Sequence, residues 1–205
     1  MLNLEANEII ESGMEANSLK DIFEDIFTIN ETEYAPPMEV QNAEIAETFL
    51  EIKELDYDVW KMLTPDERVD VLNRFESEVA TIEHRDVLPV EADELGNATY
   101  GQYSVSENKI FINKDLIASD SKEAYLETLD TYFHEGRHAY QFYNILHERT
   151  EPSDELFDAW RVNLNVLGYN SGDYGFFGSE EYYTQPVELD ARYFAEKQMN
   201  AIDLR

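Results

Sequence analysis

The longest uninterrupted helical pattern in the chain, residues 121–148, constrains the fold more than any other feature. It follows a predicted capping box between Asp120 and Glu123 and ends before Pro152. At about 100° per residue its large apolar side chains share one face: Leu129, Tyr132, Phe133, Tyr140 and Tyr143. Gly136 lies in the middle of that face, where a glycine costs about 1 kcal/mol relative to alanine. We therefore expect the helix to border the core, with another backbone packed closely on Gly136.

The opposite face of this helix carries the sequence His134-Glu135-Gly136-Arg137-His138, which has the H-E-x-x-H spacing of a zinc site. Two imidazoles four residues apart project from the same side of a helix and can bind one ion. The glutamate beside them can hold and deprotonate a metal-bound water. The chain has no cysteine, so any further ligand must be a histidine or a carboxylate. The sequence therefore predicts zinc bound by His134 and His138.

A catalytic zinc commonly takes three protein ligands and leaves one position to water. The same helix does not supply the third, because Asn144 stands where an extended H-E-x-x-H-x-x-G-x-x-H motif has its last histidine. His147 lies about 180° around the helix from His138. His84 is remote in sequence, so only the fold could bring it to the site. A carboxylate on a later helix is the remaining source of a ligand.

A last helix is predicted from Pro186, at its first position, to about Leu204. Glu188 falls on its apolar inner side, which is formed by Val187, Ala191, Phe194 and Ala195. A carboxylate facing the core needs a partner, and a metal is one. Asp190 lies about 200° from Glu188 and points away, so it is the second choice. We expect Glu188→Ala to release zinc and Asp190→Ala to retain it.

The other periodic segments predict a mostly helical fold of the α+β class. Residues 99–113 alternate apolar and polar side chains around a polar centre, which predicts a β-hairpin. Thr64-Pro65-Asp66-Glu67 is a typical capped helix start. The remaining predicted elements are helices at 39–56 and 154–167 and a glycine- and tyrosine-rich loop at 168–185.

The chain is predicted to form one main domain, residues 38–205, preceded by an acidic arm, residues 1–37. The arm contains one short amphipathic helix, residues 17–29, followed by the breaker Pro36-Pro37. The sequence has no apolar leader and no run near the 18 residues of a membrane span. These features predict a cytoplasmic protein, although a domain cut from a secreted polypeptide, a toxin or a phage particle would show the same pattern. Nothing in the pattern indicates an oligomeric state.

The composition excludes two classes of partner. Asp and Glu number 45 against 15 Lys and Arg, which gives a formal net charge of −30. Nucleic-acid binding needs basic patches, and anionic membranes repel so acidic a chain. Basic ligands and divalent cations are attracted instead. Hydrophobic residues make up 43% of the chain, which is enough to build a core.

These residues resemble the zincin metallopeptidases of the gluzincin type, in which two histidines and a glutamate bind zinc. The similarity covers about residues 99–200, and its second helix reads P-x-E-x-D-A-x-x-F-A around Glu188. This pattern is also similar to compact bacterial zincin-like proteases and to metallopeptidase domains of some toxins and phage proteins. Two positions differ. Arg137 replaces a usually uncharged residue, and Arg192 replaces an aspartate of the thermolysin-type second helix.

The resemblance implies a zincin-like fold in which residues 108–113 form the sheet edge that holds extended substrate. It implies zinc-dependent hydrolysis of a peptide or protein, with a basic substrate favoured by the charge and Glu135 as general base. Tyr182 or Tyr183 is expected to donate a hydrogen bond to the transition-state oxyanion. The candidate partners for the ring N–H groups of the histidines are Asp130, Asp190 and a backbone carbonyl.

Two other classes of protein are compatible with the same residues. One is a zincin fold that binds a partner without cleaving it, which zinc content without activity on a peptide library would indicate. The other is an acidic module that mimics DNA, which salt-sensitive binding to basic proteins that survives His134→Ala would indicate.

Overall fold

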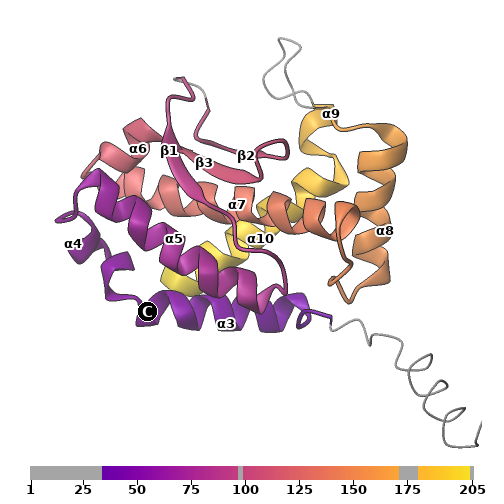
Figure 1. The fold of residues 1–205 in the computed structure, drawn as a ribbon, viewed down its shortest axis with the longest axis horizontal. Helices are drawn as coiled ribbons and strands as arrows, with labels where there is room; N and C mark the ends of the chain where they lie inside the picture. Colours follow the sequence, from indigo (N-terminus) through magenta and orange to yellow (C-terminus); the bar gives the residue numbers. More distant parts are fainter. Residues whose placement is uncertain (1–33, 97–98, 171–179, 204–205) are drawn as a thin grey trace, which may run out of the picture. The chain divides into compact units, whose positions relative to one another are not determined.

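The computed structural model describes residues 34–96, 99–170 and 180–203, which form a set of helices around one small sheet (Figure 1). The predicted α+β class and the mostly helical character are confirmed. The predicted helix at 17–29 lies outside these residues. Within them, no helix is long and apolar enough to cross a membrane.

From residue 34 onward, four helical segments precede the sheet: α3 (Met38–Glu51), η1 (Lys53–Leu55), α4 (Tyr57–Trp60) and α5 (Pro65–Ile82). The capping box at the start of α5 is confirmed. The Glu67 backbone N–H donates to the Thr64 hydroxyl at 3.3 Å, and the Thr64 N–H donates to the Glu67 carboxylate at 2.8 Å. The predicted helix at 39–56 ends earlier, because Ile52 adopts an extended conformation.

The sheet has the strand order β1 (Val90–Asp93), β3 (Lys109–Asn113), β2 (Gly101–Ser104). β3 pairs parallel with β1 and antiparallel with β2, with Tyr103 opposite Ile110. The predicted hairpin is therefore confirmed. The expectation that residues 108–113 form the sheet edge is wrong, since β3 is the central strand and β2 is the edge strand beside α7.

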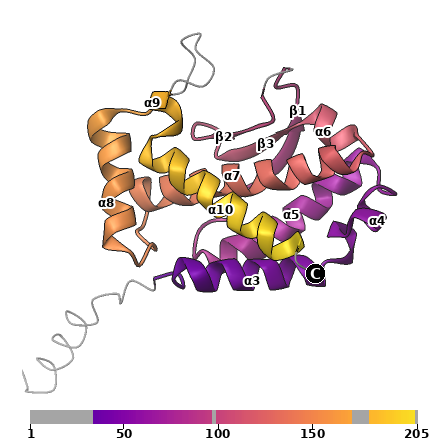
Figure 2. The ribbon, with the colours of Figure 1, turned by 180° about the vertical axis from the view of Figure 1, so that it is seen from behind.

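The second half of the chain is helical and contains α7 and α10, two long helices that pack on each other. Its elements are α6 (Lys114–Ala118), α7 (Lys122–Leu146), α8 (Asp154–Val162), the π-helical turn η2 (Asn163–Leu167), α9 (Glu180–Tyr183) and α10 (Pro186–Asp203). α7 contacts β2, β3 and α10 (Figure 2). The predicted capping box at 120–123 is not the one observed: Ser121 caps α7 by accepting from the Ala124 N–H, while Asp120 pairs with buried Arg68.

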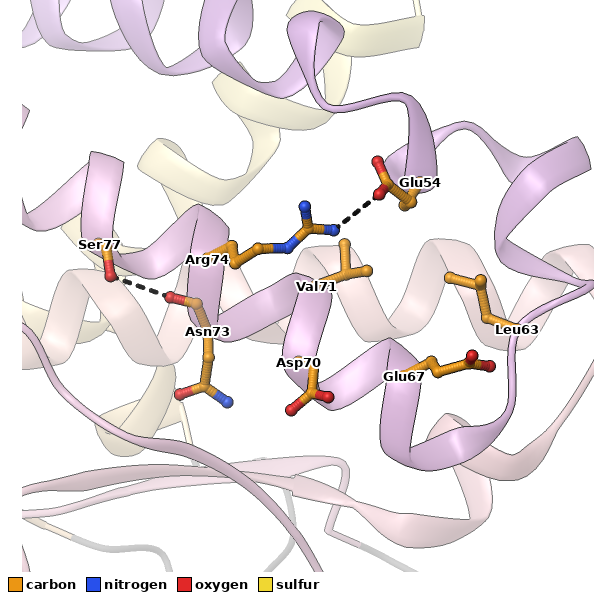
Figure 3. A pocket seen from close by; sticks show the side chains of 8 residues that line it. All are labelled: Glu54, Leu63, Glu67, Asp70, Val71, Asn73, Arg74 and Ser77. Atoms are coloured by element: carbon orange, nitrogen blue, oxygen red, sulfur yellow. Dashed lines mark hydrogen bonds and ion pairs between the residues drawn. The ribbon is translucent and has the colours of Figure 1, made fainter.

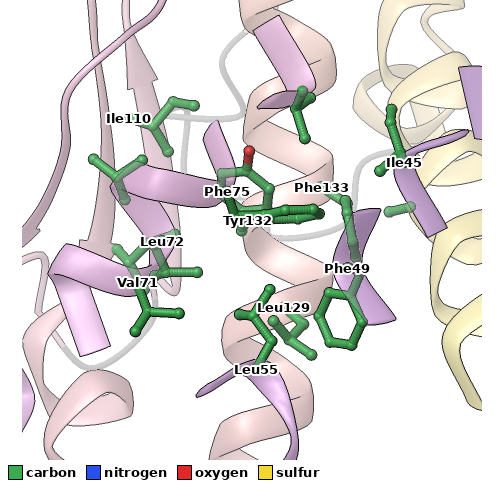
Figure 4. Close-up of a cluster of buried hydrophobic side chains, with 14 of the residues drawn as sticks. Ile45, Phe49, Leu55, Val71, Leu72, Phe75, Ile110, Leu129, Tyr132 and Phe133 are labelled. Carbon is green, nitrogen blue, oxygen red and sulfur yellow. The ribbon is translucent and has the colours of Figure 1, made fainter. Parts of the chain in front are cut away.

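The main core joins α3, α5, β1, β3, α7 and α10 through closely packed aromatic and aliphatic side chains (Figure 4). The predicted apolar face of α7 points into it, and its residues Leu129, Tyr132 and Phe133 are fully buried. Tyr140, also buried, belongs to a second cluster with Ala35, Trp160 and Val187. These two clusters fix α7 against α10, and so fix the relative position of the two predicted ligand helices.

Gly136 does not have the expected backbone neighbour: a Cβ built there would meet no atom within 4 Å. The close approach is made instead by Gly101 of β2. A Cβ there would lie 2.3 Å from Thr131 Cγ2 and 2.9 Å from the Phe111 carbonyl oxygen. The absence of a side chain at Gly101 is therefore what allows the edge strand to lie against α7.

Candidate metal centre

The structure brings His134 and His138 of α7 together with Glu188 of α10. The two Nε2 atoms are 3.1 Å apart. The carboxylate of Glu188 places Oε1 3.2 Å from His138 Nε2 and Oε2 3.5 Å from His134 Nε2. Among the described residues, this is the one group of three His, Cys, Asp or Glu side chains whose potential ligand atoms converge.

The spacing of these atoms fits a small divalent ion. A tetrahedral ion with bonds of about 2.0–2.1 Å sets its ligand atoms about 3.3 Å apart. The histidine nitrogens are 3.1 Å apart, and each lies 3.2–3.5 Å from its nearer Glu188 oxygen, with one ligand atom per residue all within 4.8 Å of one another. Two imidazoles and one carboxylate are the donor set that zinc takes in sites that keep a position open for water. Glu188 is completely buried, and His134 retains some exposure, so the group is reached from the side of His134.

The electrostatics of the group require a cation beside Glu188. Burial alone would raise the pKa of the Glu188 carboxyl, but hydrogen bonds from His134 and His138 hold it well below its usual range. Burial opposes a charge on His138, yet its hydrogen bond to Glu188 and the negative charge of Glu135 raise the pKa of its ring. The Arg192 guanidinium, 3.4 Å from Glu188 Oε2, meets this requirement in part, and a proton on histidine or a bound metal ion can meet the rest.

The ring nitrogen of His138 that faces away from Glu188 is hydrogen-bonded to a side-chain amide. Its Nδ1 lies 2.9 Å from Oε1 of Gln141, one turn further along α7. The Gln141 Nε2 donates to the Val187 carbonyl oxygen at 2.9 Å and to Asp190 Oδ2 at 2.8 Å, so it reaches the helix that carries Glu188. The sequence analysis did not assign Gln141 this role, although helical spacing places it on the same face as the histidines.

Asp190 does not point away into solvent, as the helix projection predicted. It is buried and pairs with Arg137, whose Nε lies 2.8 Å from Asp190 Oδ2. α10 is contacted by α3, α7 and α8, so more than its Glu188 side is buried. Asp190 therefore reaches His138 only through Gln141. The other proposed partner, Asp130, is exposed and hydrogen-bonds neither histidine in this part of the structure.

Glu135, the predicted general base, faces the sheet edge. Its Oε2 accepts a hydrogen bond from the Tyr103 backbone N–H of β2 at 2.8 Å. Tyr103 and Ile110 are opposite each other in the ladder, and the Tyr103 N–H points away from β3 toward α7. A carboxylate flanked by two candidate metal ligands thus lies directly against the free edge of a strand.

Of the two tyrosines predicted as oxyanion donors, Tyr182 lies near the site and Tyr183 does not. The Tyr169 hydroxyl, which the sequence analysis missed, donates to Glu188 Oε1 at 2.7 Å. Burial and the negative charge of Glu188 raise the pKa of Tyr182, which places this predicted donor beside the site. Tyr183 is half exposed and stacks under the Arg192 guanidinium, 5.0 Å from the ring centroid, so it is not part of the group. Arg192 Nη1 lies 3.4 Å from Glu188 Oε2.

The remaining histidines lie elsewhere. His147 ends α7, is exposed and stacks on Tyr143, and His84 follows the end of α5. A surface cavity of about 630 Å³ is also separate from the candidate ligands (Figure 3). It lies over α5 and is crossed by the ion pair of Arg74 with Glu54, 3.0 Å long.

Comparison of the chain with models of protein families, with curated proteins and with solved structures finds no match in any of the three. The function is therefore argued from the site itself.

Proposed function

We propose that this chain hydrolyses peptide bonds with zinc bound by His134, His138 and Glu188. The observation that supports this most is the convergence of the three ligand atoms from two helices, with Glu135 between the histidines and against a strand edge. Zinc held in this way supplies Lewis acidity and activates water at neutral pH. The zincin-like fold remains part of the proposal.

Glu135 is assigned the proton transfers. Its carboxylate takes a proton from the attacking water and passes it to the leaving amine. The Tyr103 N–H keeps one of its oxygens oriented, which leaves the other free to accept. Tyr182 is assigned the donor to the developing oxyanion, and Tyr169, which holds Glu188, is the second candidate for that role.

β2 is assigned the substrate. Because it is an edge strand, its outward backbone groups can pair with an extended peptide by β-augmentation, apart from the Tyr103 N–H, which donates to Glu135. Gly101 keeps this edge within reach of Glu135, whose Cγ would lie 3.3 Å from a Cβ at that position. The net charge of −30 favours a basic peptide or protein as the substrate.

The test combines metal analysis with turnover. Purified protein should contain one zinc, and His134→Ala should lose it. Glu135→Gln should keep zinc and lose turnover of a peptide library by at least about 100-fold, since general-base catalysis contributes that much. Glu123→Gln, an exposed residue on the same helix, is the matched control and should change neither quantity.

Each alternative result has a definite meaning. If the purified protein takes up no zinc, the proposed zinc site is wrong. A protein with zinc but without turnover of any peptide is a binding module. Turnover by Glu135→Gln at the parent rate removes Glu135 from the mechanism.

A further inference from the structure

We propose that Gln141 is a positioning residue that fixes the ring and tautomer of His138 and ties this ligand to the helix carrying Glu188. The inference rests on the proposed metal site and concerns how that site is built. In a site of this kind, a carboxylate or carbonyl usually receives the ring N–H of a ligating histidine. Here the receiving group is a neutral amide with its own connections to α10.

The hydrogen-bond network assigns the amide orientation. One end of the Gln141 amide faces two oxygens, the Val187 carbonyl at 2.9 Å and Asp190 Oδ2 at 2.8 Å, so this end must be the NH₂ group. The other end is therefore Oε1, which can only accept. His138 Nδ1 must then carry a proton. Its Nε2, which faces Glu188 and His134, donates to Glu188 in the charged ring and would offer its lone pair to an ion in the neutral ring.

An amide is the group that this position requires. The Gln141 Nε2 donates to two acceptors, the Val187 carbonyl oxygen and Asp190 Oδ2. A carboxylate at residue 141 would place an oxygen without a proton against both of them, and the two hydrogen bonds would be lost. An apolar side chain would leave His138 Nδ1 and Asp190 Oδ2 each with one partner fewer inside the protein. Gln141 itself is fully buried, so water does not replace its hydrogen bonds.

The same residue links the two ligand helices. Val187, whose carbonyl oxygen accepts from Gln141, immediately precedes Glu188. Asp190, the second acceptor, is held in turn by Arg137. Gln141 therefore sets the orientation of His138 and the position of the Glu188 backbone with one side chain, and the site is organised before an ion arrives.

The experiment uses the full chain and two variants, Gln141→Met, which has similar length but neither accepts nor donates, and Gln141→Glu, which accepts only. Gln41→Met is the matched control, because Gln41 is equally buried and donates to the Pro36 carbonyl oxygen rather than to a residue of the site. Zinc affinity is measured by competition with a chromophoric chelator. Both Gln141 variants should bind zinc about 10- to 100-fold more weakly, and the control should bind as the parent does.

A second measurement separates positioning from general loss of structure. Nitrogen-15 NMR of the metal-free parent, at a pH that leaves the rings neutral, should show His138 protonated on Nδ1. Gln141→Met should lose that preference, whereas Gln141→Glu, whose carboxylate still accepts from Nδ1, should keep it. A parent ring protonated on Nε2, or parent-like zinc affinity in both variants, would overturn the inference. If the parent binds no zinc, the proposed function fails, and the tautomer measurement still decides the role of Gln141.

Discussion

Arg137 and Asp190 form a buried ion pair between α7 and α10, with the guanidinium Nε 2.8 Å from the carboxylate Oδ2. The guanidinium carbon also lies 4.8–5.0 Å from the ring centroids of Tyr140, Trp160 and Phe194. This environment accounts for a positive charge inside the H-E-x-x-H segment. Arg137 points away from the histidines and its charge is neutralised by the helix that carries Glu188.

Asp190→Ala should destabilise the metal-free protein by about 3–5 kcal/mol, because it removes the nearer of two carboxylates that pair with buried Arg137 and leaves Glu151, 3.8 Å away. Urea unfolding measures the change. Asp58→Ala, which removes an exposed partner of Lys61, is the control and should cost under about 1 kcal/mol. Replacing both members, as in Arg137→Met with Asp190→Leu, should recover most of the loss. Equal effects of Asp190→Ala and Asp58→Ala would contradict a structural role for the pair.

Glu188→Ala should release zinc, because one of three ligands is lost, whereas Asp190→Asn should largely retain it. The asparagine keeps an oxygen that accepts from Arg137, so it disturbs the packing less than alanine does, while it removes the same negative charge. Zinc stoichiometry after dialysis against a mild chelator is the measurement. Glu196→Ala, an exposed acid on the same helix, is the control. Zinc retained by Glu188→Ala and lost from Asp190→Asn would transfer the ligand role to Asp190.

Two glycine substitutions should act in opposite directions. Gly136→Ala should stabilise the protein by about 1 kcal/mol, since helix propensity improves and no atom lies within 4 Å of the new Cβ. Gly101→Ala should destabilise it by about 1–3 kcal/mol through overlap with Thr131 and the Phe111 carbonyl. Thermal unfolding compares them. Adding Thr131→Ser removes the methyl group 2.3 Å from the new Cβ and should restore part of the stability; no recovery would place the strain elsewhere.

The titration of Glu83 should lower the free energy of unfolding as the pH rises above about 4.5. Burial raises the pKa of this carboxyl from its ordinary value of 4.5, against the attraction of Arg85 and Arg137, and its Oε1 has no hydrogen-bond partner in the described structure. The folded state then holds a proton that the unfolded chain has already released, so the free energy of unfolding decreases with pH in this window.

The variant Glu83→Gln removes this titration while keeping an oxygen for Arg85, so its free energy of unfolding should vary less with pH above about 4.5. Urea unfolding of metal-free protein from pH 4 to pH 8 measures the slope. Glu78→Gln, an exposed residue of the same helix, should leave the parent slope unchanged. A parent slope in Glu83→Gln would assign the pH dependence to other groups.

The parts of the molecule with long periodic patterns were predictable from the sequence. α7 and α10 were found with nearly correct ends, and the inner side of α10 identified Glu188 because that helix packs on α7. The helix projection failed for Asp190, because it assumes one buried face and the structure buries several. The pairing partner, Arg137, was visible in the sequence only as an unexplained charge.

Short or aperiodic segments were not predictable in the same way. β1 has four residues, of which two are acidic, and it forms by pairing with β3 rather than by its own alternation. Tyr169 lies in a segment without periodicity, so its contact with Glu188 depends on how the chain returns to the start of α10. The open space at Gly136 depends on the packing of separate elements, which helical spacing does not describe.

The apolar core joins α3, α5, α7 and α10 without using any of the three candidate ligands. The free energy of folding is therefore supplied by the core, in contrast to small zinc domains that unfold when the metal is removed. EDTA should leave the helical circular-dichroism signal intact while it abolishes activity. Returning the ion at about 1,000 times its dissociation constant should add about 4 kcal/mol of stability. Under the proposed function, the supply of metal would turn the activity off and on without any cycle of unfolding and refolding.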